Sequence, residues 1–177
     1  LTGLGQALGA EGSHDQAIAA LMRAEQIDVQ ALGPMHTFTL VAKIALADAR
    51  LSAGDASGAE TGFRQSLDAF SKIGDGKHIY AEAARLGLGK ALAAEHRCAE
   101  AEPSLVEARS RFGSEFGADD RRTIESATFL IHCMAEQGRK KQAKELFQAS
   151  EQALNKADHD VTRQRIRLQS VKAEVDG

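Results

Sequence analysis

Four side chains in the second half of the chain have the chemistry of metal ligands: His96, Cys98, His132 and Cys133. Imidazole nitrogens and thiolate sulfurs bind zinc, and four of them would complete a tetrahedral structural site. Adjacent residues on a helix point about 100° apart, which makes joint ligation by His132 and Cys133 awkward. We therefore favour buried or half-buried thiols, the usual state of unpaired cysteine. A disulfide between Cys98 and Cys133 and a metal site stay open as alternatives.

Motifs for catalysis or phosphate binding are absent from the sequence. The glycines of Leu86–Gly89 fall in the middle of an expected helix, whereas a phosphate-binding loop must precede one. No nucleophile elbow appears. Paired carboxylates such as Asp119 and Asp120, or Glu100 and Glu102, suit a helix start and a solvated face. We predict that this segment is not an enzyme, has no catalytic residues, and binds no cofactor or metal.

A period of 42 residues organises the chain around four anchor positions, Gly12, Gly54, His96 and Gly138. Further columns repeat in the same phase: Leu4, Leu46, Leu88 and Leu130; Ala17, Ala59, Ala101 and Ala143; Leu21, Phe63, Leu105 and Phe147. Self-similarity at a fixed period of this size is typical of a stacked repeat array.

Within each period the apolar spacing is helical. Leu1, Leu4 and Leu8 share one helix face, and a second helical rhythm follows Gly12. A glycine just past a helix end relieves the left-handed backbone needed there. Ser13 with Gln16 fits a capping box for the second helix. Where His96 replaces the glycine we expect modest strain or a slightly altered turn. No β-period segment competes, so the predicted fold is all-α.

The repeat columns resemble those of the tetratricopeptide repeat (TPR) family, whose usual unit has about 34 residues. The longer period and the linker are similar to the kinesin-light-chain-like branch, where the linker reads Leu-Gly-Pro-x-His-x-x-Thr. Leu32–Thr39 fits this pattern closely, Phe116–Thr123 fits in part, and Ile73–Ala81 keeps little beyond His78. The resemblance implies an α-solenoid of four antiparallel helix pairs in a right-handed superhelix. The expected repeats are residues 1–33, 34–75, 76–117 and 118–157.

The last segment, residues 158–177, is out of phase with the repeat. Its apolar residues are Val161, Ile166, Leu168, Val171 and Val175, set among arginines and a lysine. This pattern predicts a polar capping helix. The basic stretch Arg163–Arg167 could instead bind phosphate groups or an acidic partner. It has no aromatic residue and is flanked by acidic ones, so we favour the solvated face of a cap.

The composition and charge of the chain argue against nucleic acid and membranes as binding partners. A formal net charge of −3 gives no general attraction to nucleic acid. No apolar run approaches the ~18 residues that a membrane span needs, and there is no signal peptide. Two cysteines without a CxxC motif suggest a reducing compartment, so we predict a cytoplasmic location. Leu1 is not a translation start, and we expect a truncated first repeat from a longer protein.

In TPR proteins the first helix of each pair lines the concave binding face. The resemblance therefore implies that equivalent positions on the first helices of this chain form rows on a binding face. No asparagines stand on these rows, which argues against a carboxylate clamp. A shallow groove of small, apolar and a few polar residues suits an extended peptide or an amphipathic helix. The predicted contacts are Gln6, Ile44, Asp48, Leu51, Leu86, Lys90, Phe129 and His132.

The leading functional hypothesis is a non-catalytic protein–protein interaction module that binds a peptide or partner domain on its concave face. One alternative is a regulatory or sensor domain at the C-terminal end of a larger bacterial signalling protein, such as a serine/threonine kinase or a transcriptional regulator. Another is weak self-association, because a truncated first repeat would expose Leu1, Leu4 and Leu8.

Overall fold

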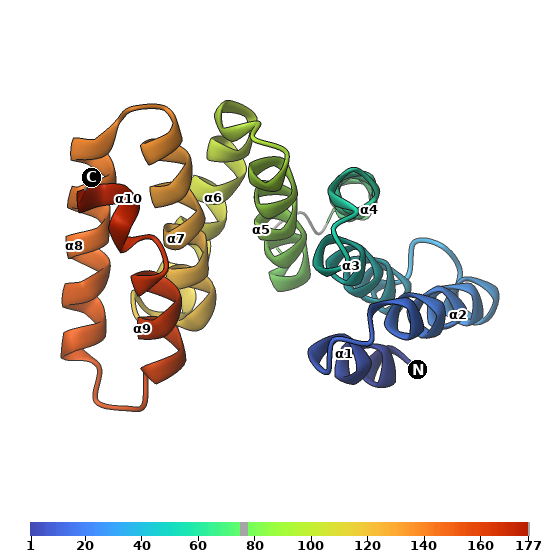
Figure 1. Ribbon diagram of the computed structural model, residues 1–177. Helices are drawn as coiled ribbons and strands as arrows, with labels where there is room; N and C mark the ends of the chain where they lie inside the picture. Colours follow the sequence, from blue (N-terminus) through green and yellow to red (C-terminus); the bar gives the residue numbers. More distant parts are fainter. Residues whose placement is uncertain (75–77, 177) are drawn as a thin grey trace. The chain divides into compact units, whose positions relative to one another are not determined.

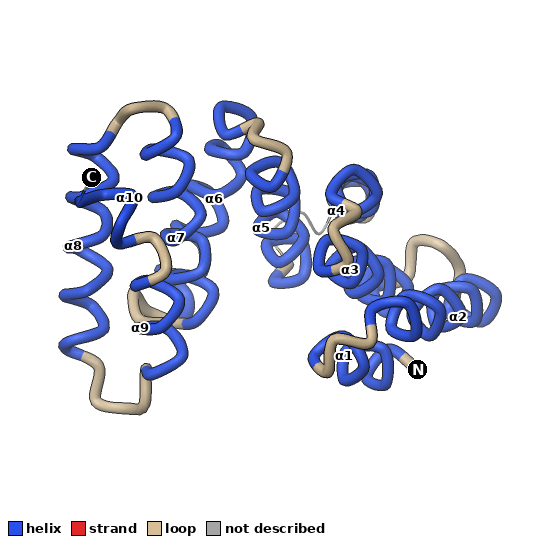
Figure 2. The backbone as a smooth tube through the Cα atoms, in the orientation of Figure 1, coloured by secondary structure: helices blue, strands red, loops and turns tan. Residues whose placement is uncertain are grey.

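The computed structural model describes residues 1–74 and 78–176, and within them every regular element is an α-helix (Figure 2). The helices are α1 (Thr2–Ala10), α2 (His14–Leu32), α3 (Thr37–Ser52), α4 (Ala56–Lys72), α5 (Ile79–Ala94), α6 (Cys98–Phe116), α7 (Arg121–Glu136), α8 (Lys140–Lys156), α9 (Thr162–Gln169) and α10 (Lys172–Asp176). The predicted all-α solenoid of helix pairs is confirmed. None of the described helices is both long enough and apolar enough to cross a membrane.

The chain divides into two compact units, residues 1–95 and 96–177. In the first unit, coloured blue to green in Figure 1, each helix of α1 to α5 packs on the next. The first helices α1, α3 and α5 also contact one another in turn, so they form one layer, while α2 and α4 form the other. Part of the core between α2 and α3 consists of Leu21, Ala45 and Leu46.

The second unit contains α6 to α10, and α9 packs beside α7 as a further first helix would (Figure 1). The predicted cap is therefore present but consists of two short helices, α9 and α10. The chain turns at Ser170 between them, which places Leu168, Val171 and Val175 in one core with Phe147 of α8. Ile166 faces outward and is 68% exposed.

The repeated columns have equivalent surroundings in most repeats. Ala17, Ala59, Ala101 and Ala143 are all fully buried. The large apolar column is buried as well, at Leu21, Phe63, Leu105 and Phe147. In the leucine column Leu46, Leu88 and Leu130 are buried, whereas Leu4 is 55% exposed. Leu4 differs because, among the described helices, α1 packs chiefly on α2 and α3, and these leave part of its leucine face exposed.

The four anchor positions all adopt the left-handed backbone. Gly12, Gly54 and Gly138 have φ angles of 81°, 87° and 73°, and His96 has 58°. Among the described residues His96 is the only non-glycine residue with positive φ. Histidine is several-fold enriched there but still disfavoured relative to glycine, so His96 keeps the left-handed turn of the glycine repeats in a less favourable backbone conformation. The predicted capping box is not formed, because the Ser13 side chain makes no capping hydrogen bond.

The linker motif works as a cap for the following first helix. Nδ1 of His36 accepts a hydrogen bond from the Phe38 amide at 3.2 Å, and Oγ1 of Thr39 donates to the Gly33 carbonyl at 2.8 Å. His78 repeats the first contact with the Tyr80 amide. The histidine of the motif therefore satisfies an orphan amide at the start of α3, and the threonine bonds the carbonyl of Gly33, which ends α2.

Asp120 occupies the same capping position at the start of α7. Its Oδ1 accepts from the Arg122 amide at 2.9 Å, and both its oxygens accept from the Arg122 guanidinium. Burial raises the pKa of the Asp120 carboxyl, but the hydrogen bonds from Arg122 outweigh it and hold that pKa below its usual value. A carboxylate thus replaces the imidazole of His36 and His78 without loss of the cap.

The predicted repeat boundaries after residues 33, 117 and 157 lie in the turns between successive helix pairs. The boundary after residue 75 lies outside the described residues. Because the boundary between the two units follows Glu95, it falls inside the third predicted repeat, between its two helices.

Candidate functional site

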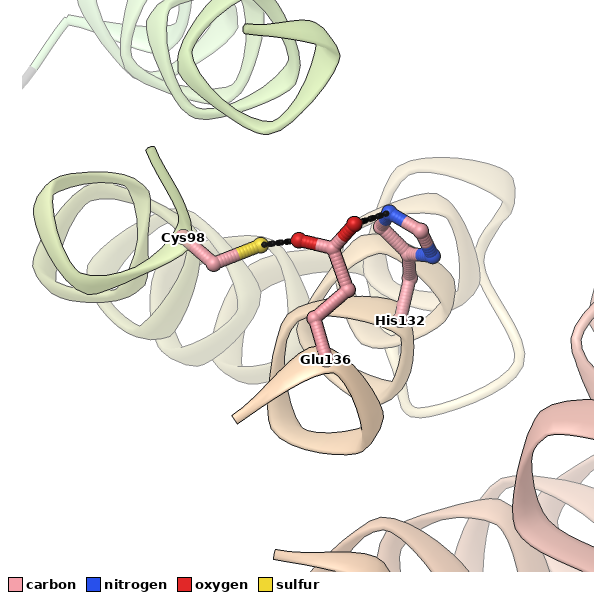
Figure 3. A group of neighbouring side chains, drawn as sticks. All are labelled: Cys98, His132 and Glu136. Carbon is pink, nitrogen blue, oxygen red and sulfur yellow. Dashed lines mark hydrogen bonds and ion pairs between the residues drawn. The ribbon is translucent and has the colours of Figure 1, made fainter. Parts of the chain in front are cut away.

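A cluster of ligand-type side chains lies where the start of α6 meets the end of α7. It consists of Cys98, the first residue of α6, with His132 and Glu136 one turn apart on α7 (Figure 3). One ligand atom from each lies within 4.8 Å of the others. We call these three residues the Cys98 cluster.

The two cysteines form a disulfide, Cys98–Cys133, with their Cα atoms 4.9 Å apart. Our preference for unpaired thiols is therefore wrong, and the structure has the disulfide that we had kept as an alternative. The reason is the antiparallel packing of α6 on α7, which brings Cys98 beside the last turns of α7. Cys133 stands in the small-residue column of Ala7, Ala49 and Ala91, and it is fully buried.

Glu136 lies at the centre of the Cys98 cluster. Its Oε2 is 3.2 Å from Sγ of Cys98, and its Oε1 is 3.6 Å from Nε2 of His132, as the dashed lines in Figure 3 show. His96, at the strained turn, places Nδ1 2.8 Å from the same Oε1. The side chains of His132 and Glu136 are 29% and 30% exposed, so the cluster is open to solvent on one side.

A second carboxylate orients the His132 ring. Nδ1 of His132 lies 3.0 Å from Oε2 of Glu174, on α10. Because a carboxylate accepts, Nδ1 is the donor in this contact, and the ring orientation that it fixes turns Nε2 toward Glu136. Such a carboxylate–imidazole pair is the usual support of a histidine that binds a metal.

His96, Cys98, His132 and Cys133 could be singled out from the sequence, whereas Glu136 and Glu174 were missed. Glu136 could have been found, because it follows His132 by four residues and so shares its helix face. Glu174 carried no signal of this kind. It reaches His132 only because the cap folds back onto α7.

The predicted partner-binding residues are of two kinds in the structure. Gln6 on α1 and Asp48 on α3 are exposed, and Lys90 on α5 is half-buried. Leu51, Phe129 and His132 are also half-buried. By contrast, Ile44 and Leu86 are each only 6% exposed and belong to the interior.

Solved structures with the same arrangement of helices were found by comparison. A crystal structure of a putative kinesin light chain with nearly identical TPR-like repeats, from Podosopora anserina, superposes with a TM-score of 0.76 at 18% identity, covering 99% of this chain and 91% of that one. A crystal structure of a variant of the same protein gives 0.80 at 19% identity, over 98% and 81% of the two chains. A TPR-like protein from Chlorobium tepidum gives 0.66 at 15% identity, over 77% and 92%.

This chain has a TPR-like fold. No protein-family model matches its sequence, and no curated protein matches it either. At this level of identity the likeness concerns the fold alone. The TPR-like arrangement explains why the columns at the 42-residue period are buried and why the odd-numbered helices α1, α3 and α5 share a layer.

A shallow groove of about 790 Å³ lies against the TPR-like helices α2 and α3. Its apolar lining comes from Met22 and Val29, which are exposed on α2, together with Leu46. Charged side chains of both signs surround them, Arg23, Glu25 and Arg50. The sequence analysis did not place apolar contacts on α2, because it assigned the binding face to the first helices.

The basic stretch of the cap is used inside the TPR-like second unit. Arg167 pairs with the buried carboxylate of Glu125 on α7. Arg165 donates to the Leu154 carbonyl and to the Asn155 side chain, both at 2.7 Å. These contacts attach α9 to the helices beneath it and favour the cap interpretation over a phosphate-binding one.

Proposed function

We propose that this chain is a non-catalytic protein–protein interaction module that binds a peptide or a partner domain on the layer of first helices. The observation that carries the proposal is the row at which Gln6, Asp48 and Lys90 stand on α1, α3 and α5. These helices pack side by side in the first unit, and the row is exposed or half-buried on all three. A rigid scaffold that presents such a row binds with little loss of conformational entropy.

Ile44 and Leu86 are buried, so we leave them out of the proposed contact residues. Both are interior residues, so the accessible part of the face is more polar than the sequence suggested. Apolar contact would come from the half-buried Leu51 in the first unit, and Phe129 offers the second unit a half-buried apolar contact of its own. A partner with mixed charge and a few apolar anchors, such as an extended peptide, fits this surface.

Replacing Lys90 and Phe129 together by alanine should weaken binding of a partner at least tenfold. Truncating residues that carry binding energy costs more than about 1 kcal/mol each. The partner would be obtained by affinity capture and identification, then purified, and its affinity measured by isothermal titration calorimetry.

The matched control is the double change Arg64→Ala and Gln148→Ala, at exposed positions of the second helices α4 and α8. Both double variants should keep the circular dichroism spectrum of the parent chain. Unchanged affinity of the Lys90/Phe129 variant, or a larger loss in the control, would refute the proposed face.

A second candidate function is self-association through α1. Leu1 and Leu4 are 54% and 55% exposed, an apolar surface on one helix that no other described helix covers. If two copies bury it together, light scattering should show a mass that rises with concentration, and Leu4→Lys should abolish the rise. A single mass, that of the monomer, at every concentration contradicts this function.

The predicted cytoplasmic location stays a proposal, and the disulfide bears on it. Cytosolic thiols are kept reduced by the cell, whereas disulfides persist in oxidising compartments. In the cytoplasm the Cys98–Cys133 pair would therefore exist as a dithiol for much of the time. Reduction also changes the chemistry of Cys98, because its sulfur becomes a free thiol or thiolate.

A further inference from the structure

The carboxylate of Glu136 lies beside the disulfide, but it cannot accept a hydrogen bond from it. The Oε2 atom of Glu136 lies 3.2 Å from Sγ of Cys98, which is hydrogen-bonding distance. A disulfide sulfur carries no proton, so in this state an anionic oxygen faces sulfur lone pairs. After reduction Cys98 becomes a thiol that can donate to the carboxylate, or a thiolate that needs a cation between them.

The His132 ring also points toward the carboxylate of Glu136. With Nδ1 directed at Glu174, His132 turns Nε2 to the side that Glu136 occupies. One sulfur, one nitrogen and one oxygen atom thus lie within 4.8 Å of one another. Around a tetrahedral zinc ion the ligand atoms are about 3.5 Å apart, given metal–ligand distances of about 2.0–2.3 Å. Small side-chain movements would bring the three ligand atoms to the separations that a zinc ion requires.

His96 supports the carboxylate of Glu136. It occupies the strained turn position at which the other repeats have glycine, and its Nδ1 lies 2.8 Å from Oε1 of Glu136. Holding Oε1 directs the other oxygen, Oε2, toward Cys98. Cys98 itself is the first residue of α6, where the partial positive charge of a helix N-terminus favours a thiolate.

We propose that the reduced chain binds one Zn²⁺ ion through Sγ of Cys98, Nε2 of His132 and the carboxylate of Glu136, with water as the fourth ligand, and that the disulfide switches this site off. Two thiols of a reductant supply two electrons and two protons to the Cys98–Cys133 bond and leave as a disulfide. Cys98 then loses its proton as zinc binds. A small-molecule disulfide can reverse this: it takes two electrons from the Cys98 thiolate and the Cys133 thiol, and it leaves as two thiols with one proton from Cys133 and one from water. The Cys98–Cys133 bond re-forms and the ion is released.

Cys133 is placed as the redox partner and not as a ligand. It is fully buried, and it is not among the three residues whose ligand atoms lie within 4.8 Å of one another. Other repeats have alanine at its position, Ala7, Ala49 and Ala91. Cys133→Ala therefore keeps the packing type of the column and leaves Cys98 permanently free, which makes it the decisive variant.

Zinc content after equilibrium dialysis, and the visible spectrum with Co²⁺ in place of zinc, would test the proposal. The reduced chain should retain one zinc per chain and show thiolate-to-cobalt charge transfer, whereas the oxidised chain should show neither. Cys133→Ala should bind with or without reductant. Cys98→Ser should lose binding, and His132→Ala and Glu136→Gln should each weaken it more than tenfold. Glu174→Gln should weaken it about 10- to 100-fold as a supporting residue.

Circular dichroism would establish that each variant is folded, and the reduced parent chain needs no substitution at all. The proposal is overturned if both the reduced chain and Cys133→Ala fail to retain zinc. It is equally overturned if Cys98→Ser binds as tightly as the reduced chain, since the exposed histidines elsewhere would then account for the ion.

Discussion

Phe63→Ala should lower the free energy of unfolding by about 3–5 kcal/mol, the usual cost of truncating a buried phenylalanine. Phe63 is completely buried in α4. Its ring lies against Gly87 of α5, where an added Cβ would overlap it. The ring fills the space beside the Gly87 backbone, so its removal leaves a cavity next to α5. Urea denaturation followed by circular dichroism would measure the loss.

Phe38→Ala is the matched control, because Phe38 is 64% exposed at the start of α3. It should change the free energy of unfolding by no more than about 0.5 kcal/mol. Equal losses at Phe63 and Phe38 would contradict the packing described for α4 and α5.

Gly87→Ala provides a test of the same contact from the other side. Alone it should destabilise by about 1–3 kcal/mol through overpacking. In the Phe63→Ala background it should be neutral or stabilise by up to ~1 kcal/mol, because alanine is the better helix former. The equivalent change Gly3→Ala, where no atom stands within 4 Å, should stabilise α1 without any partner change. Additive effects at Phe63 and Gly87 would show that the two residues do not touch.

Reducing the Cys98–Cys133 disulfide in the presence of a chelator should cost about 3–4 kcal/mol of the free energy of unfolding. The two cysteines are 35 residues apart, and the bond restricts a loop of that length in the unfolded chain. The measurement is urea denaturation of the parent chain with and without a phosphine reductant, with zinc removed by the chelator.

Cys133→Ala serves as the control for this second experiment, since it has no disulfide to lose and should not respond to the reductant. Thiol titration of the unfolded, untreated parent chain should find no free cysteine. If the reductant leaves the unfolding curve of the parent chain unchanged, the disulfide does not contribute as the loop length predicts.

Much of the architecture could be predicted from the sequence because it depends on local, periodic features. The left-handed turns at Gly12, Gly54 and Gly138 follow from a backbone that glycine adopts without strain. The capping of α3 by His36 follows from one residue placed before orphan amides. Each such signal acts over a few residues, and its repetition at a fixed period identifies the stacked helix pairs.

The exposure of the proposed binding rows could be predicted less well, for a physical reason. Helical spacing tells which residues share a face, but the exposure of that face depends on which neighbouring helices cover it. Ile44 and Leu86 share the first-helix face with Asp48 and Lys90, yet the first two are buried and the last two are accessible. Periodicity alone does not separate the part of a face that meets solvent from the part that meets a neighbour.

The sequence by itself determined the all-α repeat fold, the turns and the cap, since local backbone preference and apolar spacing are written in neighbouring residues. Only the tertiary structure decided the pairing of Cys98 with Cys133 and the convergence of Glu136 and Glu174 on His132. Those contacts join residues that are close only because α6 packs antiparallel on α7 and the cap folds back over α7. Distances between side chains on separate helices depend on packing, and no short-range pattern encodes them.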